Sequence, residues 1–427
     1  MSYGHTPLMT LTSPWGAYYS VWENAKDGKT LGYYWTYIWN FQTMQRRSFL
    51  VIASSFALSQ LLVGCGGRNQ ETLKVSLLNG SIPGQVVGKF RKSFQRGVNL
   101  NFSAVAQLKN SYENLQTWHS RINGKKDEGW LSLLPFGPWR PIPVADLVTL
   151  GDYWLAAAIE QQLIQPLDVS EMKEWSNLDR KWQELVKRNE KGLVDPKGQI
   201  WAAPYRWGST VIVYNRDKFK DFDWKPQDWK DLWRPELRSR ISLLNQSRET
   251  IGLTLKKLGK SYNTQKLSEV PQLESELRAL NKQVKLYSSD RYIEPLIIGD
   301  TWVGVGWSSD ILPLVARYPQ LTVVIPSSGT ALWADLWVHP TNKNTNETNL
   351  FYKWIDFCLQ KDIAKQISLL TKTNSPINLK ISADDISQPL KKILTDNSST
   401  LEKSEFLLAL PKETAQEYDS LFAKIKN

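Results

Sequence analysis

The sequence has few of the residues that build disulfide frameworks and metal centres. It contains two cysteines, Cys65 and Cys358, and three histidines among 427 residues. None of the histidines (His5, His119 and His339) has a partner at the spacing of metal ligands, and no Cys-x-x-Cys or His-Glu-x-x-His motif occurs. We therefore expect no disulfide scaffold, no metal site and no cofactor.

Catalytic motifs are also missing. The sequence contains no Gly-x-Ser-x-Gly nucleophile elbow and no visible nucleophile–base pair. The segment Gly259-Lys260-Ser261 resembles the end of a nucleotide-binding loop, but Thr254 stands where that loop needs glycine. We interpret this segment as a helix terminus, and we expect that the protein is not an enzyme.

Long apolar runs and clustered charge are scarce as well. The apolar run at residues 49–63 is too short for a comfortable transmembrane helix, and no second run is longer. The net charge is +11, but the lysines and arginines are scattered along the chain. This distribution favours anionic lipid headgroups or a partner protein, and not nucleic acid, as the neighbour of the basic surface.

Residues 44–67 have the order of parts found in a lipoprotein signal peptide. Arg46 and Arg47 form the charged region, residues 49–63 form the apolar region, and a Leu-x-Gly-Cys box ends at Cys65. We expect cleavage before Cys65 and a lipid on its thiol that holds the protein at the cell membrane, on the periplasmic side. The alternative is a buried helix with a core cysteine. The paired arginines fit a twin-arginine signal and a general secretory signal equally well.

The signal divides the chain. Residues 1–43 precede it and are predicted to be a gene-model extension or a disordered cytoplasmic extension, with Met44 as the true start. Residues 44–64 are the predicted signal peptide, and residues 65–71 are a polar tether. The remainder is long enough for two packed domains, and Cys358, in an apolar helical stripe, is predicted to be a core residue.

Strand-like and helix-like patterns alternate after the tether. Alternating apolar residues predict strands at residues 73–77, 98–102 and 147–150, and each is followed by a helical period. A long β-rich segment covers residues 200–215. This alternation predicts an α/β fold with parallel sheets.

The strand predicted at residues 331–338 has an unusual polar face. Trp333, Asp335 and Trp337 fall on one face, and the apolar residues between them fall on the other. A carboxylate between two indoles suits an organic cation, because it pairs with an ammonium group while the indoles add roughly 0.5–2 kcal/mol of cation–π attraction. The alternative is an aspartate that caps a turn beside exposed aromatics.

Other acids and aromatics follow predicted strands, at the places where α/β sheets bind ligands. Trp307 ends a glycine-containing strand, and Asp310 follows it after Ser308 and Ser309. Tyr153 and Glu249 stand at comparable places after earlier strands. For Asp310 and Glu249, the alternative is a first-turn acid that the helix dipole favours.

Several segments occur together in an order that is found in one known family. They are Asp146-Leu147-Val148 with Gly151-Asp152-Tyr153, Ala203-Pro204-Tyr205-Arg206-Trp207-Gly208, Gly306-Trp307-Ser308-Ser309-Asp310, Trp333-Ala334-Asp335-Leu336, and the helical stretch 351–366. In this order they resemble the periplasmic polyamine-binding proteins, the spermidine/putrescine receptors of ABC importers. The resemblance covers roughly residues 72–427.

The resemblance implies a two-lobe fold of the periplasmic-binding-protein type II. Each lobe would be a mainly parallel sheet flanked by helices, with a ligand cleft between the lobes. Residues 72–210 and 332–380 would form lobe 1, and residues 211–331 and 381–427 would form lobe 2.

The resemblance also implies a set of ligand-binding residues, namely Trp307, Trp333, Asp335, Asp310, Glu249 and Tyr153. Trp307 and Trp333 would flank the methylene chain of a polyamine, and Asp335 would pair with a terminal ammonium group. Asp310 matches an acid of the putrescine-binding members, and Glu249 would supply an acid from the opposite lobe. The tyrosine would line the first lobe.

Some positions depart from the family. Leu78-Asn79-Gly80-Ser81 replaces a Trp-Thr-x-Tyr segment, Gln246 stands where an acid is normal, and Leu407 stands where a polar residue is expected. Lys372 lies near a position where the family has tyrosine, and its charge would repel a diamine. Residues 121–140 resemble an insertion.

The implied function is that of an extracytoplasmic solute-binding lipoprotein. It would deliver a polyamine of the putrescine or spermidine kind to the permease subunits of an ABC importer, binding this cationic ligand as a monomer by lobe closure. It would contact the membrane through the lipid at Cys65 and would not bind nucleic acid. The alternatives are a neutral or anionic organic solute in the same cleft, and a structural lipoprotein without a transport role.

Overall fold

The computed structural model describes residues 10–12, 18–20, 71–94, 98–123, 144–315, 317–341, 349–379, 400 and 402–426. The chain forms two compact units that divide after Arg68. In the first unit, strands β1 (Thr10–Thr12) and β2 (Tyr18–Ser20) pair antiparallel. The predicted signal peptide at 44–64, Cys65, and most of the predicted insertion at 121–140 lie outside the described residues.

The second unit is built on one sheet with the strand order β11-β10-β12-β9-β14-β5-β3-β4. These strands are β3 (Glu71–Leu78), β4 (Val98–Val105), β5 (Leu147–Gly151), β9 (Ala203–Asn215), β10 (Ile241–Leu243), β11 (Val284–Tyr287), β12 (Val303–Trp307) and β14 (Ala331–Pro340). Three short strands join them, β6 (Ile164–Gln165), β13 (Leu321–Val324) and β15 (Glu405–Phe406). A separate two-stranded ribbon pairs β7 (Lys187–Arg188) with β8 (Gln199–Ile200).

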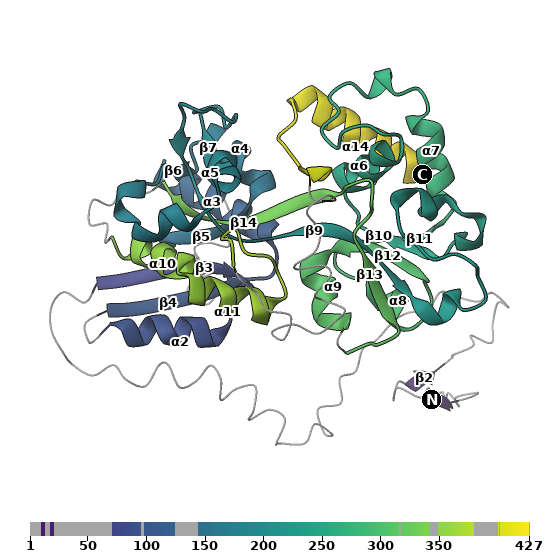
Figure 1. The fold of residues 1–427 in the computed structure, drawn as a ribbon, viewed down its shortest axis with the longest axis horizontal. Coiled ribbons are helices and arrows are strands. Elements are labelled where there is room, and N and C mark those ends of the chain that lie inside the picture. The colour runs from purple at the N-terminus through teal and green to yellow at the C-terminus, as the bar shows by residue number, and fades with distance from the viewer. Residues whose placement is uncertain are drawn as a thin grey trace, which may run out of the picture. The chain divides into compact units, whose positions relative to one another are not determined.

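Strands β9 and β14 are antiparallel neighbours that join the two halves of this unit. Along β9, residues 203–209 pair with β14, and residues 210–214 pair with β12. Figure 1 shows β9 and β14 running side by side between two groups of helices. The middle of β9 is therefore the place where the chain passes from one lobe to the other.

Lobe 1 is the half around the parallel strands β3, β4 and β5. Its helices are α2 (Gly84–Ser93), α3 (Leu108–Ile122), α4 (Asp152–Glu160), α5 (Arg180–Val186), α10 (Leu350–Leu359) and α11 (Lys361–Thr371). The buried residues described in its core lie within 73–207 and 332–377, and Leu379 and Phe406 pack against them partly buried. Trp354 is fully buried there, in edge contact with Phe90 and tilted against Phe102. Cys358 is buried and free, as predicted.

Lobe 2 is the half around the parallel strands β10, β11 and β12. Its helices are α6 (Ser247–Lys257), α7 (Leu273–Asn281), α8 (Glu294–Ile297), α9 (Ser308–Val315) and α14 (Lys412–Lys426). The C-terminal helix α14 packs its buried residues Tyr418, Phe422 and Ile425 against α6 and α7. The predicted helix terminus at Gly259 is confirmed, because α6 ends at Lys257 and Gly259 has φ +71°.

The predicted α/β fold with two lobes is thus confirmed, whereas the residue boundaries proposed for the lobes stay a prediction. One expectation for β14 was wrong. Trp337 does not stand beside Asp335 in a cation pocket, because it is fully buried in the lobe 1 core. It stacks on Tyr205 with ring centroids 4.3 Å apart and meets Trp354 edge-on.

Among the helices of the described part of the chain, none combines the length and the apolarity that a membrane crossing requires.

We expect Trp354→Ala to destabilise lobe 1, because it removes a large buried ring from the aromatic core. The expected loss is about 3–5 kcal/mol of unfolding free energy, measured by urea denaturation and circular dichroism. Ile298→Ala is the control, because that side chain is 78% exposed and its loss should cost less than about 0.5 kcal/mol. Equal losses in the two variants would contradict this account of the core.

Candidate ligand-binding site

The candidate site lies on one face of the sheet where β9, β12 and β14 meet. Three cross-strand pairs define it, Arg206 with Asp335, Gly208 with Trp333, and Thr210 with Trp307. Alternate residues of a strand share a face, and so do directly opposed residues of neighbouring strands. The register therefore sets two tryptophans, an arginine and an aspartate on the same face, at the passage between the lobes.

A buried ion pair occupies the lobe 1 end of this face. Arg206 Nε donates to Asp335 Oδ2 at 2.6 Å, and the two side chains are 6% and 1% exposed. Burial raises the pKa of Asp335, and the charge and hydrogen bond of Arg206 oppose that shift. The guanidinium carbon also lies 5.9 Å from the Trp333 ring centroid. The carboxylate that was predicted to meet a ligand ammonium thus meets a cation of its own chain.

Gly208 lets two side chains meet over β9. A Cβ atom at this position would lie 2.3 Å from Trp333 Cζ2 and 2.4 Å from Ser308 Oγ. Ser308, the first residue of α9, accepts a hydrogen bond from the Ser209 backbone at 3.2 Å. The indole nitrogen of Trp333 is buried, and it has no hydrogen-bond partner within the described residues.

Asp310 is held by a tyrosine that packs on β12. A Cβ atom on Gly306 would lie 1.9 Å from the Tyr292 ring, so a larger residue would displace this ring. The Tyr292 hydroxyl donates to Asp310 Oδ2 at 3.1 Å and accepts from the Trp307 backbone at 3.2 Å. Desolvation raises the pKa of Asp310, while the Tyr292 hydrogen bond and the charge of Arg206 lower it. Asp310 is therefore fixed close enough to Arg206 to interact with its charge.

Glu249 supplies a second acid from the first turn of α6. Its side chain is buried, and both carboxylate oxygens accept from the Thr210 hydroxyl at 3.0 Å. Trp307 Nε1 donates to the same carboxylate at 3.3 Å. Burial raises the pKa of Glu249 to about 7, against the opposing effect of these hydrogen bonds. An acid with this pKa changes its charge readily when a cation arrives.

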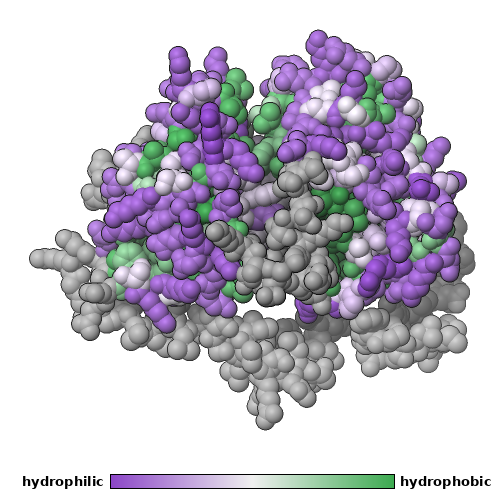
Figure 2. Space-filling model, viewed as in Figure 1, coloured by the Kyte–Doolittle hydropathy of each residue, from purple (hydrophilic) through white to green (hydrophobic). Residues whose placement is uncertain are grey.

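Tyr153 lies apart from this cluster, on the edge of lobe 1. It belongs to α4, is 41% exposed, and interacts electrostatically with Arg248 of α6 and Asp419 of α14. It therefore faces lobe 2. Figure 2 shows a notch between the two halves at the top of the view, with hydrophobic residues on both of its sides.

The residue before Tyr153 is a buried acid. Asp152 Oδ1 accepts from the Ala334 backbone at 2.9 Å, so it ties α4 to β14 beside Asp335. Burial raises the pKa of Asp152 to about 7, and the nearby charge of Asp335 adds to this rise, whereas Arg188 opposes it.

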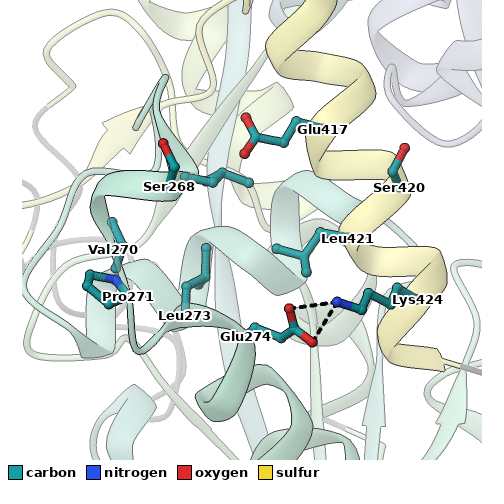
Figure 3. A pocket seen from close by; sticks show the side chains of 10 residues that line it. Ser268, Val270, Pro271, Leu273, Glu274, Glu417, Ser420, Leu421 and Lys424 are labelled. Atoms are coloured by element: carbon teal, nitrogen blue, oxygen red, sulfur yellow. Dashed lines mark hydrogen bonds and ion pairs between the residues drawn. The ribbon is translucent and has the colours of Figure 1, made fainter.

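A second concave region lies within lobe 2, between α7 and α14. Figure 3 shows apolar side chains such as Leu273 and Leu421 lining this groove. Its charged pair, Glu274 and Lys424, is already joined at 2.8 Å. None of its lining residues belongs to the face described above. Because this groove lies apart from the clustered acids and indoles, it is a weaker candidate for a charged ligand.

The structure brings Trp307, Trp333, Asp335, Asp310 and Glu249 together and places Tyr153 at the rim. The ligand-binding roles predicted for these residues stay predictions. Sequence reasoning gave no role to Arg206, Asp152 or Tyr292. Only Arg206 had a usable signal, because it is a single charge within the apolar β-rich segment 200–215 and a buried charge needs a partner. In the described ranges, no three metal-ligating side chains are grouped as a metal site.

Residues 143–392, more than half of the chain, match the family of bacterial extracellular solute-binding proteins. The chain belongs to this family. Its relatives are therefore transport proteins that bind solutes.

Individual relatives point in the same direction. The spermidine/putrescine-binding periplasmic protein of Escherichia coli strain K12 is 28% identical over 266 residues, which cover 62% of this chain and 69% of that protein. The putrescine-binding periplasmic protein PotF of the same strain is 29% identical over 239 residues, covering 52% of this chain and 62% of that protein.

Solved structures support the fold. The spermidine/putrescine ABC transporter substrate-binding protein PotD of Streptococcus pneumoniae aligns with a TM-score of 0.68 and 20% sequence identity. The alignment covers 83% of this chain and 98% of that structure. This solute-binding protein thus shares the two-lobe architecture of that structure.

Glu249 should give the stability of the ligand-free protein a pH dependence. Its pKa is about 7 in the folded state against an ordinary value of 4.5, so the folded protein binds the proton more tightly. The resulting stabilisation is fully present below pH 4.5 and is lost as the pH rises through 7. We expect Glu249→Gln to remove a decline on the order of 3 kcal/mol between pH 4.5 and 8.

The measurement is urea unfolding at several pH values. Glu413→Gln, which changes an exposed glutamate of α14, is the matched control and should keep the wild-type profile. A Glu249→Gln profile that runs parallel to the wild type would show that this carboxyl is not titrating in that range.

Proposed function

We propose that this protein is the solute-binding component of an ABC importer and that it binds an aliphatic amine of the polyamine class. The binding place is the face formed by β9, β12 and β14. The observation that carries the proposal is the joining of an acid and an indole from different elements, Glu249 of α6 and Trp307 of β12, at 3.3 Å. The names of the relatives support the ligand class.

Burying an ammonium group costs free energy, because the group loses its hydration. An ammonium that leaves water needs a carboxylate partner, and Glu249 and Asp310 offer two on the lobe 2 side. Trp307 lies next to both acids. Its indole N–H donates to Glu249, and its backbone N–H donates to the Tyr292 hydroxyl, which in turn donates to Asp310. The indole would cover the methylene groups of the ligand while the acids neutralise the amine.

Lobe closure would complete the site. Tyr153 on lobe 1 faces Arg248 and Asp419 on lobe 2, and Gln107 of lobe 1 donates to Asp290 of lobe 2. The hydrogen bond between Gln107 and Asp290 joins the two lobes, so opening the lobes would break it, and would also move Tyr153 away from the charges of Arg248 and Asp419. A closed lobe pair excludes water from the charges between them, which strengthens their attraction.

We expect isothermal titration with putrescine or spermidine to give saturable heat. Trp307→Ala should weaken binding about 2- to 30-fold, the equivalent of roughly 0.5–2 kcal/mol of cation–π attraction. Trp302→Ala is the control, because that indole packs on Arg240 at 4.9 Å, away from the site, and its loss should leave the affinity unchanged. A chain that binds no amine would support a neutral or anionic solute, or a structural role.

The proposal includes a lipid anchor at Cys65, on the periplasmic side of the cell membrane. It is supported by the signal-peptide pattern of residues 44–67 and by relatives that are named periplasmic. One or two acyl chains provide the membrane affinity, since each buried CH₂ contributes about 0.8 kcal/mol.

Cys65→Ser should release the protein. We expect the wild type in the membrane fraction and the variant in the soluble fraction after cell lysis, as measured by immunoblotting. Cys358→Ser is the control, because this cysteine is buried in α10 and its replacement should not change the fraction. Equal distribution of wild type and Cys65→Ser would contradict acylation at this residue.

A further inference from the structure

We propose that Arg206 is a built-in counter-ion that takes the place of one ligand ammonium group. The site would then select amines with one ammonium end and one carbonyl or carboxylate end, in preference to free diamines. This inference rests on the proposed function, keeps the aliphatic amine as ligand and specifies the chemistry of its second end.

The negative charge of Asp335 is already paired within the protein. An ammonium site needs a carboxylate and gains from an aromatic face, and Asp335 and Trp333 offer both. In the structure a guanidinium already satisfies them, with Nε 2.6 Å from Asp335 Oδ2 and its carbon 5.9 Å from the Trp333 ring. Asp335 is 1% exposed, so a second cation has neither unpaired charge nor solvent access to use there.

Hydrogen-bond donors of Arg206 and Trp333 remain unused at this end of the site. A guanidinium has five N–H groups, and the bond to Asp335 uses the one on Nε. The four N–H groups on the terminal nitrogens donate to no residue in the described part of the chain. The buried indole N–H of Trp333, on the same face, likewise lacks an acceptor among described residues. Unused donors without acceptors fit a carbonyl or carboxylate oxygen of a ligand.

The other end of the face carries two acids. Glu249 and Asp310 flank Trp307, and within the described ranges neither acid forms an ion pair. An arginine is close enough to each acid to interact with its charge, but no cation neutralises it by direct contact. The two ends thus differ in kind, with carboxylates that no cation contacts at the lobe 2 end and unused N–H donors at the Arg206 end. A ligand that matches both carries one amine and one acceptor group on a methylene chain.

The test is a titration of the full protein with three compounds that share a four-carbon chain and one ammonium end. Putrescine has two ammonium ends, N-acetylputrescine has one ammonium and one carbonyl, and 4-aminobutyrate has one ammonium and one carboxylate. We expect wild type to bind at least one of the last two about tenfold or more tightly than putrescine. The last two compounds also distinguish a carbonyl from a carboxylate as the preferred acceptor.

Arg206→Gln should reverse this order. Without the guanidinium, Asp335 becomes available to an ammonium group, so putrescine should bind more tightly than to wild type, while the acceptor-ended compounds lose about tenfold or more. Arg240→Gln is the matched control, because it also removes an arginine from a tryptophan face, that of Trp302, outside the site. It should leave the order of the three affinities unchanged.

A second variant covers the case in which Arg206→Gln fails to fold. Arg206→Gln with Asp335→Asn removes both charges and leaves no buried ion, and it should lose the preference for the acceptor-ended compounds. Tighter binding of putrescine than of both other compounds by wild type would overturn the inference. An unchanged order of affinities in Arg206→Gln and in the double variant would also overturn it. If wild type binds none of the three, the proposed function fails and the inference fails with it.

Discussion

The site depends on the buried ion pair between Arg206 and Asp335. Two ions removed from water lose several kcal/mol of hydration each, and only close contact with further hydrogen bonds compensates this loss. Here the contact is 2.6 Å, between strands that both pass from one lobe to the other. Removing one partner would leave an unpaired charge in the centre of the protein, at a cost of about 3–5 kcal/mol. The pair therefore constrains both the register of β9 against β14 and the charge that a ligand meets.

Glycines position the other groups around this pair. Gly208 leaves room for Trp333 and Ser308, and Gly306 leaves room for Tyr292, which in turn holds Asp310. Burial then shifts the acids, so that Glu249 and Asp152 both have pKa values of about 7. An arriving cation would favour the charged form of a nearby acid and thereby strengthen its own binding. The local packing thus determines the electrostatics of the site as well as its shape.

Much of this could be predicted from the sequence, because strand and helix periods are local properties. The α/β alternation, the strand that carries Trp333 and Asp335, and the helix whose first turn holds Glu249 follow from such periods. The partner of Asp335 could not be predicted in this way, since Arg206 is 129 residues away and only the register of two strands brings them together. Alternation also fails to tell which residue of a face lies deeper, so it could not separate Trp337 in the core from Trp333 at the site.

This separation of local pattern from long-range pairing has a consequence for ligand specificity. The fold and the motif order are shared with polyamine-binding proteins, and they depend on many residues spread over both lobes. The ligand end that Asp335 can accept depends on one side chain of β9. Specificity is a difference between two binding free energies, and a single buried cation changes that difference by repelling one class of ligand end and attracting another. Under the proposed counter-ion role, a chain keeps the architecture of its family while one buried arginine changes the charge at one end of the candidate site.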